Sequence, residues 1–461
     1  MRRSLFVAFA LAVLAALLTS TGAYARSNDR VVGAYFASWD IYDRGYFPKQ
    51  IPASKLTTLF YAFAAPAQDG TCGILDPWAD YQRPYAAEES VDGVPDDPAN
   101  LDQHLFGNFN QLRKLKARNP GLQILISLGG FTQSTYFSDV AATPASRAKF
   151  VSSCIDTFIK GDLPGGSWPP GAGGQGAAAG VFDGIDVDWE YPGLDVGNQA
   201  HHSPADTHNA TLLFREFRSQ LDALGSQTGK HYLLTAALPA GNVNSQQFEL
   251  ADVSRTVDWI NLLTFDFHGP WDRHTDFNSP FFIDPFEVFD APPPASRTAF
   301  TTLGTVLLYI GKGVSPSKLV VGVPFYARQY VRVGTANHGL YQTFDNTGLD
   351  PNSLQWDRTP TPTYHDLIDN AGIVSRDGVG QNGYTRFWNP FTRVPWLFSP
   401  SASHAFASGA VVTPTFISYD DPRSLAERTR LVDQLHLRGV WAWEISQDDD
   451  AHDLVNAIAA G

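Results

Sequence analysis

The segment FDGIDVDWEYPG, residues 182–193, combines the apolar residues of a buried strand with several carboxyl groups. Side chains of an extended strand alternate between its two faces. Three of the carboxyl groups therefore share one face: Asp186, Asp188 and Glu190. The opposite face carries large apolar residues that need a core: Ile185, Val187 and Trp189. Burying unpaired carboxyl groups is costly, so a strand of this kind indicates a functional site rather than a stabilising element.

Similar short apolar segments recur along the chain, with helical patterns between most of them. The eight predicted strands cover residues 31–36, 57–63, 122–127, 181–188, 232–237, 258–264, 318–325 and 438–443. Apolar residues three or four positions apart predict intervening helices, as in Leu105, Phe109, Leu112 and Leu115. Asp421 and Pro422 mark the start of a further helix. Eight apolar strands alternating with helices predict an α/β fold, a TIM (β/α)8 barrel with its helices outside.

Three segments define the expected domain organisation. Residues 1–25 read as a secretory signal peptide, because Arg2 and Arg3 precede an apolar run and Ala23-Tyr24-Ala25 offers a cleavage pattern. We expect cleavage near Ala25 and a secreted protein. Residues 26–461 form the barrel. The connection between the seventh and eighth strands is too long for a plain loop, so residues 329–416 are predicted to be a small α+β insertion domain within the barrel.

The amino-acid composition indicates which kinds of molecule the protein is suited to bind. The formal net charge of −14 disfavours nucleic acid and anionic membrane surfaces as partners. The chain is rich in aromatic residues, with 31 Phe, 17 Tyr and 11 Trp, and flat rings are suited to stacking on sugars. Neither HExxH-type spacing nor a CxxC pair occurs, so we expect no metal and no cofactor. Cys72 and Cys154 form either one disulfide bridge or two buried thiols. The chain is expected to be a monomer.

The acidic strand has a chemical interpretation once it is placed in a barrel. Active sites of such barrels lie at the carboxyl ends of the strands. The fourth strand would deliver Glu190 to this rim, with Asp188 and Asp186 behind it. Carboxyl groups so close together cannot all ionise, so at least one proton is retained and the pKa of Glu190 is raised. A carboxylic acid that stays protonated near neutral pH can protonate a glycosidic oxygen.

The segment DGIDVDWE resembles the DxxDxDxE signature of family 18 glycoside hydrolases, the chitinases. Further segments resemble the other strand-end motifs of that family in the same order, and the resemblance extends over nearly the whole chain after residue 25. These segments are VVGAYFASW (31–39), YAFA (61–64), ISLGG (126–130), INLLTFDFHGPW (260–271), GVPFYAR (322–328), SYDDPRS (418–424) and GVWAWEISQDD (439–449).

This resemblance implies a mechanism and a substrate, chitin or N-acetylglucosamine oligosaccharides. Glu190 would be the acid and base, while the N-acetyl carbonyl of the substrate attacks the anomeric carbon to give an oxazolinium ion and net retention. Asp188, turning between Asp186 and Glu190, would orient the acetamido group. Asp266 would provide a second polar contact to the acetamido group, and Asp183, on the other strand face, is expected to be structural.

The same resemblance predicts the residues that bind substrate. They are Tyr35, Trp39, Phe63, Gly129, Gly130, Phe131, Tyr191, Phe265, Trp271, Tyr326, Arg328 and Trp443. Trp443 would form the floor under the distorted sugar. The chain departs from the family pattern at three positions. Leu263 replaces a Met, Phe265 replaces a Tyr whose hydroxyl orients the acetamido oxygen, and Phe131 replaces a Trp. Without the hydroxyl at position 265, we expect an enzyme that is either slower on simple chitin or suited to a modified glycan.

Two alternatives to a chitinase follow from the same residues. An endo-N-acetylglucosaminidase acting on other glycans would use the same carboxyl groups, although such relatives usually lack the long insertion. A non-catalytic chitin-binding lectin would share the fold, although such relatives typically lose the acid that Glu190 provides here. Release of reducing sugar from chitin separates the enzymes from the lectin.

Overall fold

The computed structural model describes residues 30–166, 168–197, 201–287, 299–401 and 413–461. The predicted signal peptide at residues 1–25 lies outside the described residues. Within them, no helix is both long and apolar enough to cross a membrane.

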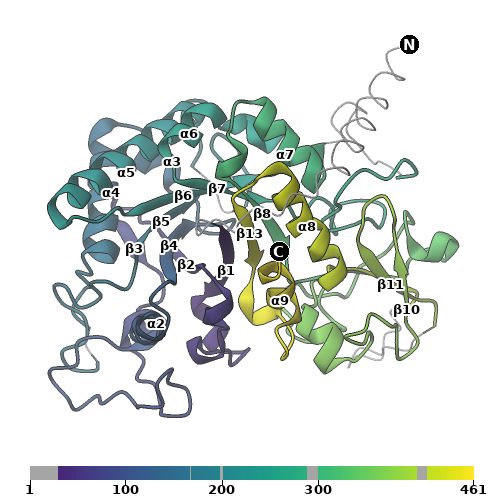
Figure 1. Cartoon of the computed structure of the whole chain (residues 1–461), viewed down its shortest axis with the longest axis horizontal. Helices are drawn as coiled ribbons and strands as arrows, with labels where there is room; N and C mark the ends of the chain where they lie inside the picture. Colours follow the sequence, from purple (N-terminus) through teal and green to yellow (C-terminus); the bar gives the residue numbers. More distant parts are fainter. Residues whose placement is uncertain (1–29, 167, 198–200, 288–298, 402–412) are drawn as a thin grey trace.

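Eight parallel strands form a closed barrel, which confirms the predicted TIM fold (Figure 1). The barrel closes because β1 pairs in parallel with both β2 and β13, the first and last strands meeting side by side. A short strand, β3 (Cys72–Ile74), adds to β2 in antiparallel orientation. The barrel strands are β1 (Val31–Ala37), β2 (Thr58–Pro66), β4 (Gln123–Gly129), β5 (Gly184–Asp188), β6 (Leu233–Pro239), β7 (Trp259–Leu263), β8 (Leu319–Pro324) and β13 (Gly439–Trp443).

The acidic strand begins three residues later than predicted. Val181 closes a turn, its N–H donating to the carbonyl of Ala178, and Asp183 makes the first backbone bond to the neighbouring strand through Ile124. Ladder pairing with β4 therefore starts at Gly184.

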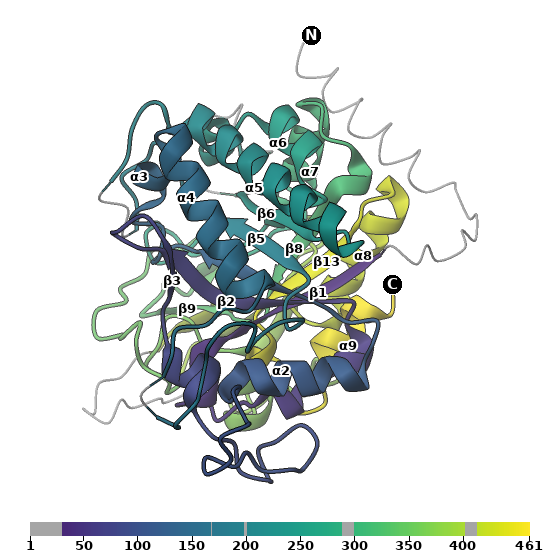
Figure 2. The same ribbon diagram turned by 90° about the vertical axis from the view of Figure 1, so that its left-hand side faces the viewer.

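Helices cover the outside of the barrel. Figure 1 shows α4, α5, α6 and α7 along one side of the strands, and Figure 2 shows α2 and α9 on the opposite side. The helix predicted at Asp421 is confirmed, because the Asp421 carboxylate accepts the backbone N–H of Ser424 and caps α8. The helices are α2 (Gly107–Arg118), α3 (Phe137–Ala141), α4 (Pro144–Cys154), α5 (Asp206–Thr228), α6 (Leu250–Thr256), α7 (Thr302–Gly311), α8 (Pro422–Leu435) and α9 (Asp453–Ala459).

Two apolar layers result from the alternation of side chains along the strands. The larger layer lies between the barrel and the helices, and it contains Ile185, Val187 and Trp189 of the acidic segment. A smaller aromatic layer fills the inside of the barrel, including Tyr35, Phe60 and Trp441. Because the two faces of β5 belong to different layers, its carboxyl groups project into the barrel while its apolar residues hold the strand against the helices.

A second sheet lies between β8 and β13 in the chain. Its four antiparallel strands have the order β10-β11-β12-β9, and it lies beside α8 (Figure 1). The sheet has a small core of its own, centred on Phe277, Trp396 and Phe416. However, Tyr364 and Leu367 from the same region pack in the main core. The strands are β9 (Arg328–Val331), β10 (Thr385–Trp388), β11 (Pro395–Ser399) and β12 (Thr415–Ser418).

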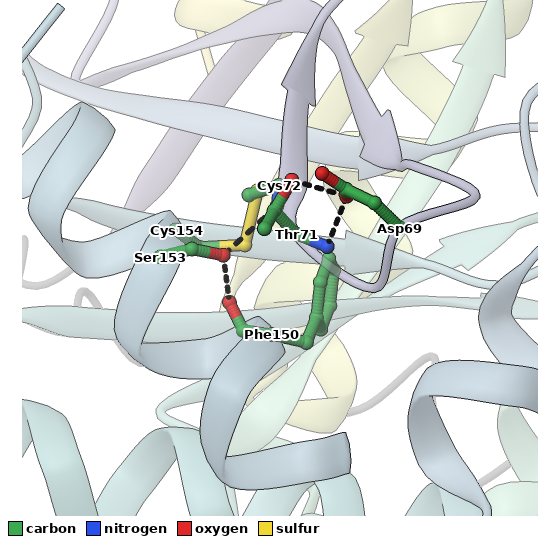
Figure 3. Close-up of a disulfide and its surroundings, with 6 residues drawn as sticks. All are labelled: Asp69, Thr71, Cys72, Phe150, Ser153 and Cys154. Atoms are coloured by element: carbon green, nitrogen blue, oxygen red, sulfur yellow. Dashed lines mark hydrogen bonds between the residues drawn. A yellow bond between two sulfur atoms is a disulfide. The ribbon is translucent and has the colours of Figure 1, made fainter.

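The structure decides between the two states that the sequence left open for the cysteines. Cys72 of β3 and Cys154 at the end of α4 form a disulfide bridge (Figure 3). Beside the bridge, the backbone N–H of Cys72 donates to Ser153 Oγ at 2.8 Å. The bridge therefore joins the connection after β2 to the helix layer across 82 residues of sequence.

Candidate active site

The carboxyl end of β5 is held by close backbone contacts to β4. Gly129 and Gly130 both have positive φ, and a Cβ at Gly130 would lie 2.7 Å from the Phe63 ring. The N–H of Gly130 donates to the carbonyl of Asp188 at 2.8 Å. Only glycine adopts these positive φ values readily while leaving room for such neighbours. The two glycines thus let the β4 backbone approach the acidic strand, while their predicted contact with substrate stays a prediction.

Ser134 completes the support of this strand end. Its hydroxyl donates to the carbonyl of Gly130 at 2.9 Å and accepts the backbone N–H of Glu190 at 3.1 Å. One side chain thereby fixes the start of the segment that carries the predicted acid.

Asp186 is fully buried at the centre of a hydrogen-bond network inside the barrel. Its two oxygens accept bonds from four side chains on different strands: Tyr35 at 2.5 Å, Ser127 at 2.8 Å, Thr235 at 2.5 Å and Asn261 at 3.2 Å. Burial raises the pKa of Asp186, and the bonds from Thr235, Tyr35, Ser127 and Asn261 oppose that rise. Asp186 is therefore fixed in place by its donors.

Asp188 lacks such support. It is 4% exposed, and its Oδ1 is buried with no hydrogen-bond donor among the described residues. Burial raises the pKa of Asp188 well above its ordinary value, and the charges of Glu190 and Asp186 raise it further. A buried oxygen without a donor is costly. The arrangement therefore favours a proton on Asp188 and leaves this oxygen available to a ligand's donor.

Glu190 lies half-buried just beyond the end of β5. Burial raises its pKa to about 7, a bond from the Tyr191 hydroxyl lowers it, and the charge of Asp266 raises it. Because the carboxyl groups of Glu190, Asp188 and Asp186 interact, they titrate as a set. At least one of them stays protonated near neutral pH, which is the state that protonation of a leaving oxygen requires.

Asp266 lies after β7, and its side chain is fixed by hydrogen bonds from residues that follow β8. Its Oδ1 accepts the Tyr326 hydroxyl at 2.6 Å and the guanidinium of Arg328, and its backbone N–H donates to Asn278 at 3.0 Å. Arg328 also lies over the Trp271 ring, 5.0 Å from its centroid. The predicted residues Asp266, Tyr326, Arg328 and Trp271 thus form one connected group.

The predicted aromatic residues fall into two sets by exposure. Three are open to solvent: Trp39 at 46%, Phe131 at 53% and Trp271 at 59%. Trp443 is half-buried, and its ring stacks on Phe63 at 5.7 Å between centroids. Tyr191 and Phe265 are also half-buried. Tyr35 is only 1% exposed and its hydroxyl donates to Asp186, so its substrate contact stays a prediction that this geometry does not favour.

Asp183 has the outward, structural position that its strand face predicted. Its carboxylate pairs with Lys116 at 2.7 Å and accepts the backbone N–H of Ile124 at 2.8 Å. It therefore links β4 to α2 on the helix side of the barrel.

Three of the donors that hold Asp186 were not predicted from the sequence. Ser127, Thr235 and Asn261 are polar residues within otherwise apolar strand segments, and all three are fully buried. That isolated polarity is a signal that could have indicated them, because a buried polar side chain needs a partner. Ser134 lies in a connection with no such apolar background, and it offered no signal.

Two groups of side chains among the described residues have the spacing of metal ligands: His268, Asp276 and Glu287, and His365, Asp369 and Asp450. A cation occupies the first group, and one lies beside the second. Burial lowers the pKa of His268, but Asp276, Asp272 and Glu287 outweigh it and raise the pKa to about 9. Arg376 pairs with Asp369 at 2.5 Å. The donor sets therefore fit internal ion pairs better than a bound metal.

Known proteins resemble this chain in sequence over most of its length. The sequence model described as Glycosyl hydrolases family 18 matches residues 31–448. Chitinase A1 of Niallia circulans is 34% identical over 459 residues, covering 92% of this chain and 57% of that protein. Chitinase C of Streptomyces lividans is 32% identical, covering 90% of this chain and 56% of that protein. The chain thus spans just over half the length of these curated relatives.

One solved structure aligns with this protein over nearly the full length of both chains. The catalytic domain of psychrophilic chitinase B from Arthrobacter TAD20 superposes with a TM-score of 0.79 at 31% identity, covering 94% of this chain and 95% of that one. A family 18 N-acetylglucosaminidase from Paenibacillus barengoltzii superposes with a TM-score of 0.67 at 26% identity. From the match over residues 31–448, the barrel and the DxxDxDxE segment on β5, it follows that the chain belongs to glycosyl hydrolase family 18.

Proposed function

We propose that this protein is a chitinase that hydrolyses β-1,4 links between N-acetylglucosamine units. The observation that carries the proposal is the acid set at the end of β5, in which the pKa of Glu190 is raised to about 7 beside two further buried carboxyl groups. The chitinases among the relatives support the choice of substrate.

In the proposed mechanism the substrate supplies the nucleophile. Glu190 gives its proton to the leaving glycosidic oxygen while the carbonyl oxygen of the 2-acetamido group attacks the anomeric carbon of the same sugar, and the bond to the leaving oxygen breaks. The oxazolinium ion that forms carries a positive charge beside the ionised Glu190, and Asp188 orients it by accepting the acetamido N–H at its unpartnered Oδ1. Glu190 then removes a proton from water, and the product retains the β configuration. Asp186 takes no part in bond breaking and holds the set in place.

Asp266 and the aromatic rings bind and orient the chain of sugars. Trp443 provides the floor, and the exposed rings of Trp39, Phe131 and Trp271 offer stacking surfaces. Residues 329–416 form the proposed α+β unit on the barrel rim. Its first strand begins at Arg328, which pairs with Asp266, so the unit forms one wall of the cleft.

The cellular setting is part of the proposal. A signal peptide over residues 1–25 would direct the chain out of the cell, where its disulfide bridge is stable. The mature protein is proposed to act as a monomer on chitin or its soluble oligomers.

A product time course on chitin hexamer tests this function. Purified protein should release shorter oligomers that first appear as the β anomer, and Glu190→Gln should release none above background. A hexamer without the acetyl group at the cleaved position should resist hydrolysis, because it lacks the nucleophile. Cleavage of high-mannose glycopeptides with intact chitin hexamer would instead identify an endo-N-acetylglucosaminidase. Tight binding of hexamer without any product would identify a lectin.

A further inference from the structure

Two carboxyl groups outside the β5 set lie just beyond the carboxyl ends of β1 and β13, which are paired neighbours in the barrel. Asp40 lies in the turn of 3-10 helix after β1, Ser38–Ile41, and Glu444 follows β13 directly. Asp40 is fully buried and Glu444 is 2% exposed. The two side chains lie close enough that, after burial and the charge of Glu444, a hydrogen bond to Glu444 is a further cause of the raised pKa of Asp40. Two carboxylates have no proton to share in such a contact, so at least one of the groups must be protonated.

The remaining bonds identify which group carries the proton. Both oxygens of Glu444 accept bonds from Ser446, at 2.7 Å from its hydroxyl and 2.9 Å from its backbone N–H. Asp40 Oδ2 accepts the backbone N–H of Ala37 at 3.0 Å. Asp40 Oδ1 is buried, and no N–H or O–H donor among the described residues reaches it. A protonated Oδ1 that donates to Glu444 satisfies every oxygen of the pair.

The other charged groups around the pair agree with this assignment. Arg44 Nε lies 4.0 Å from Glu444 Oε1, on the side of the acceptor. From the turn after β1, Tyr46 faces Glu444, Asp448 and Asp40. From the β13 side, Asp448 is engaged by the backbone N–H groups of α9. Burial raises the pKa of Asp40 well above its ordinary value, and the charge of Glu444 raises it further.

Each member of the pair is the chain neighbour of an aromatic residue of the cleft. Trp39 precedes Asp40, and Trp443 precedes Glu444. Both rings contact Phe63, with centroid distances of 6.1 Å for Trp39 and 5.7 Å for Trp443. A bond between Asp40 and Glu444 therefore ties the exposed ring of Trp39 to the cleft floor.

We propose that Asp40 and Glu444 share one proton and act as positioning residues, setting the spacing of Trp39 and Trp443 so that oligosaccharide binding weakens when the proton is lost. This role rests on the proposed function only in that the two rings bind sugars. Loss of the proton leaves two adjacent buried carboxylates, whose repulsion separates the turn after β1 from the end of β13. Trp39 then moves relative to the floor, while the acid set on β5 is untouched.

The first test needs no substrate and compares Asp40→Asn with wild type and with Asp43→Asn, an exposed residue of the same turn. The Asn amide donates to Glu444 without titrating. Because the folded-state pKa of Asp40 is raised, the contribution of Asp40 to the stability of wild type is largest at low pH. That stability is lost as pH rises from the ordinary aspartate value of 3.8 through the raised value. The difference in melting temperature between Asp40→Asn and wild type should therefore increase in favour of the variant as pH rises. The melting temperature of Asp43→Asn should show the same pH dependence as that of wild type.

The second test measures KM and kcat on chitin hexamer from about pH 5 to about pH 9. The KM of wild type should rise on the alkaline side, while the KM of Asp40→Asn should stay level because its bond persists. Asp40→Ala should raise KM roughly two- to tenfold at every pH, the range expected for one aromatic contact. Its kcat should change little. Asp448, whose pKa is raised to about 8 by burial, is present in all variants and cancels in the comparison.

The two tests fail in different ways. If Asp40→Asn shows the same pH dependence of melting as wild type, or raises KM as much as Asp40→Ala, the shared proton is refuted. If hexamer is not cleaved by wild type, the proposed function fails, but the melting comparison still decides the proton, and hexamer binding measured by tryptophan fluorescence replaces KM.

Discussion

Replacing Glu190 with Gln should abolish hydrolysis and, at the same time, stabilise the fold at neutral and alkaline pH. The pKa of Glu190 is raised from 4.5 to about 7, mainly by burial. Each tenfold change in proton affinity corresponds to about 1.4 kcal/mol, so ionised Glu190 destabilises the fold by about 3 kcal/mol. The contribution of Glu190 to stability is therefore fully present below pH 4.5 and is lost as pH rises through about 7. A neutral Gln avoids that loss.

Thermal unfolding at pH 4 and pH 8 provides the assay, with Glu88→Gln at an exposed position as control. Glu190→Gln should match wild type at about pH 4 and melt roughly 3 °C higher at about pH 8, for a chain of this length. Its hydrolysis of chitin hexamer should fall by about 10²–10⁴-fold, because general acid catalysis is lost. A variant equally destabilised at both pH values would refute burial as the cause of the raised pKa. Activity above about a tenth of wild type would refute the catalytic assignment.

Three further predictions follow from other contacts. The Phe265 ring is half-buried, with its centroid 5.4 Å from that of Trp441. Phe265→Tyr should raise kcat on hexamer up to about tenfold with little change in KM, because the new hydroxyl orients the acetamido oxygen. A fall in both kcat and melting temperature would show a pocket shaped around the phenyl ring. Arg328→Ala removes the guanidinium that holds Asp266 and should lower kcat/KM roughly tenfold. The control is Arg332→Ala, which removes an ion pair to Asp345 just after the end of β9 and should leave kcat/KM unchanged. Replacing both Cys72 and Cys154 by Ser should destabilise the fold by about 4 kcal/mol, as for a loop of this length, without changing kcat at low temperature; a wild-type melting temperature in the Ser variant would contradict the structural role of the bridge.

Local patterns in the sequence predicted the barrel and the position of its acid set. The alternation along residues 182–193 assigned Asp186, Asp188 and Glu190 to one face, and the structure places the apolar face of the same strand against the helices. Asp421 predicted the start of α8 because the capping bond to Ser424 spans only three residues. Such features depend on backbone geometry over a few residues, which the sequence specifies directly.

Contacts between distant segments were decided by the tertiary structure. Closure of the barrel brings Tyr35 to Asp186 across 151 residues. Packing of α4 against β3 joins Cys72 to Cys154, where the sequence allowed either a bridge or free thiols. The same closure places Asp40 against Glu444, although neither residue is unusual within its own segment. The acidic residues of β5 were visible because they interrupt a local pattern. Their donors and the second carboxyl pair were not, because a hydrogen bond between strands depends on which strands become neighbours and in what register, and that is fixed only when the sheet closes on itself.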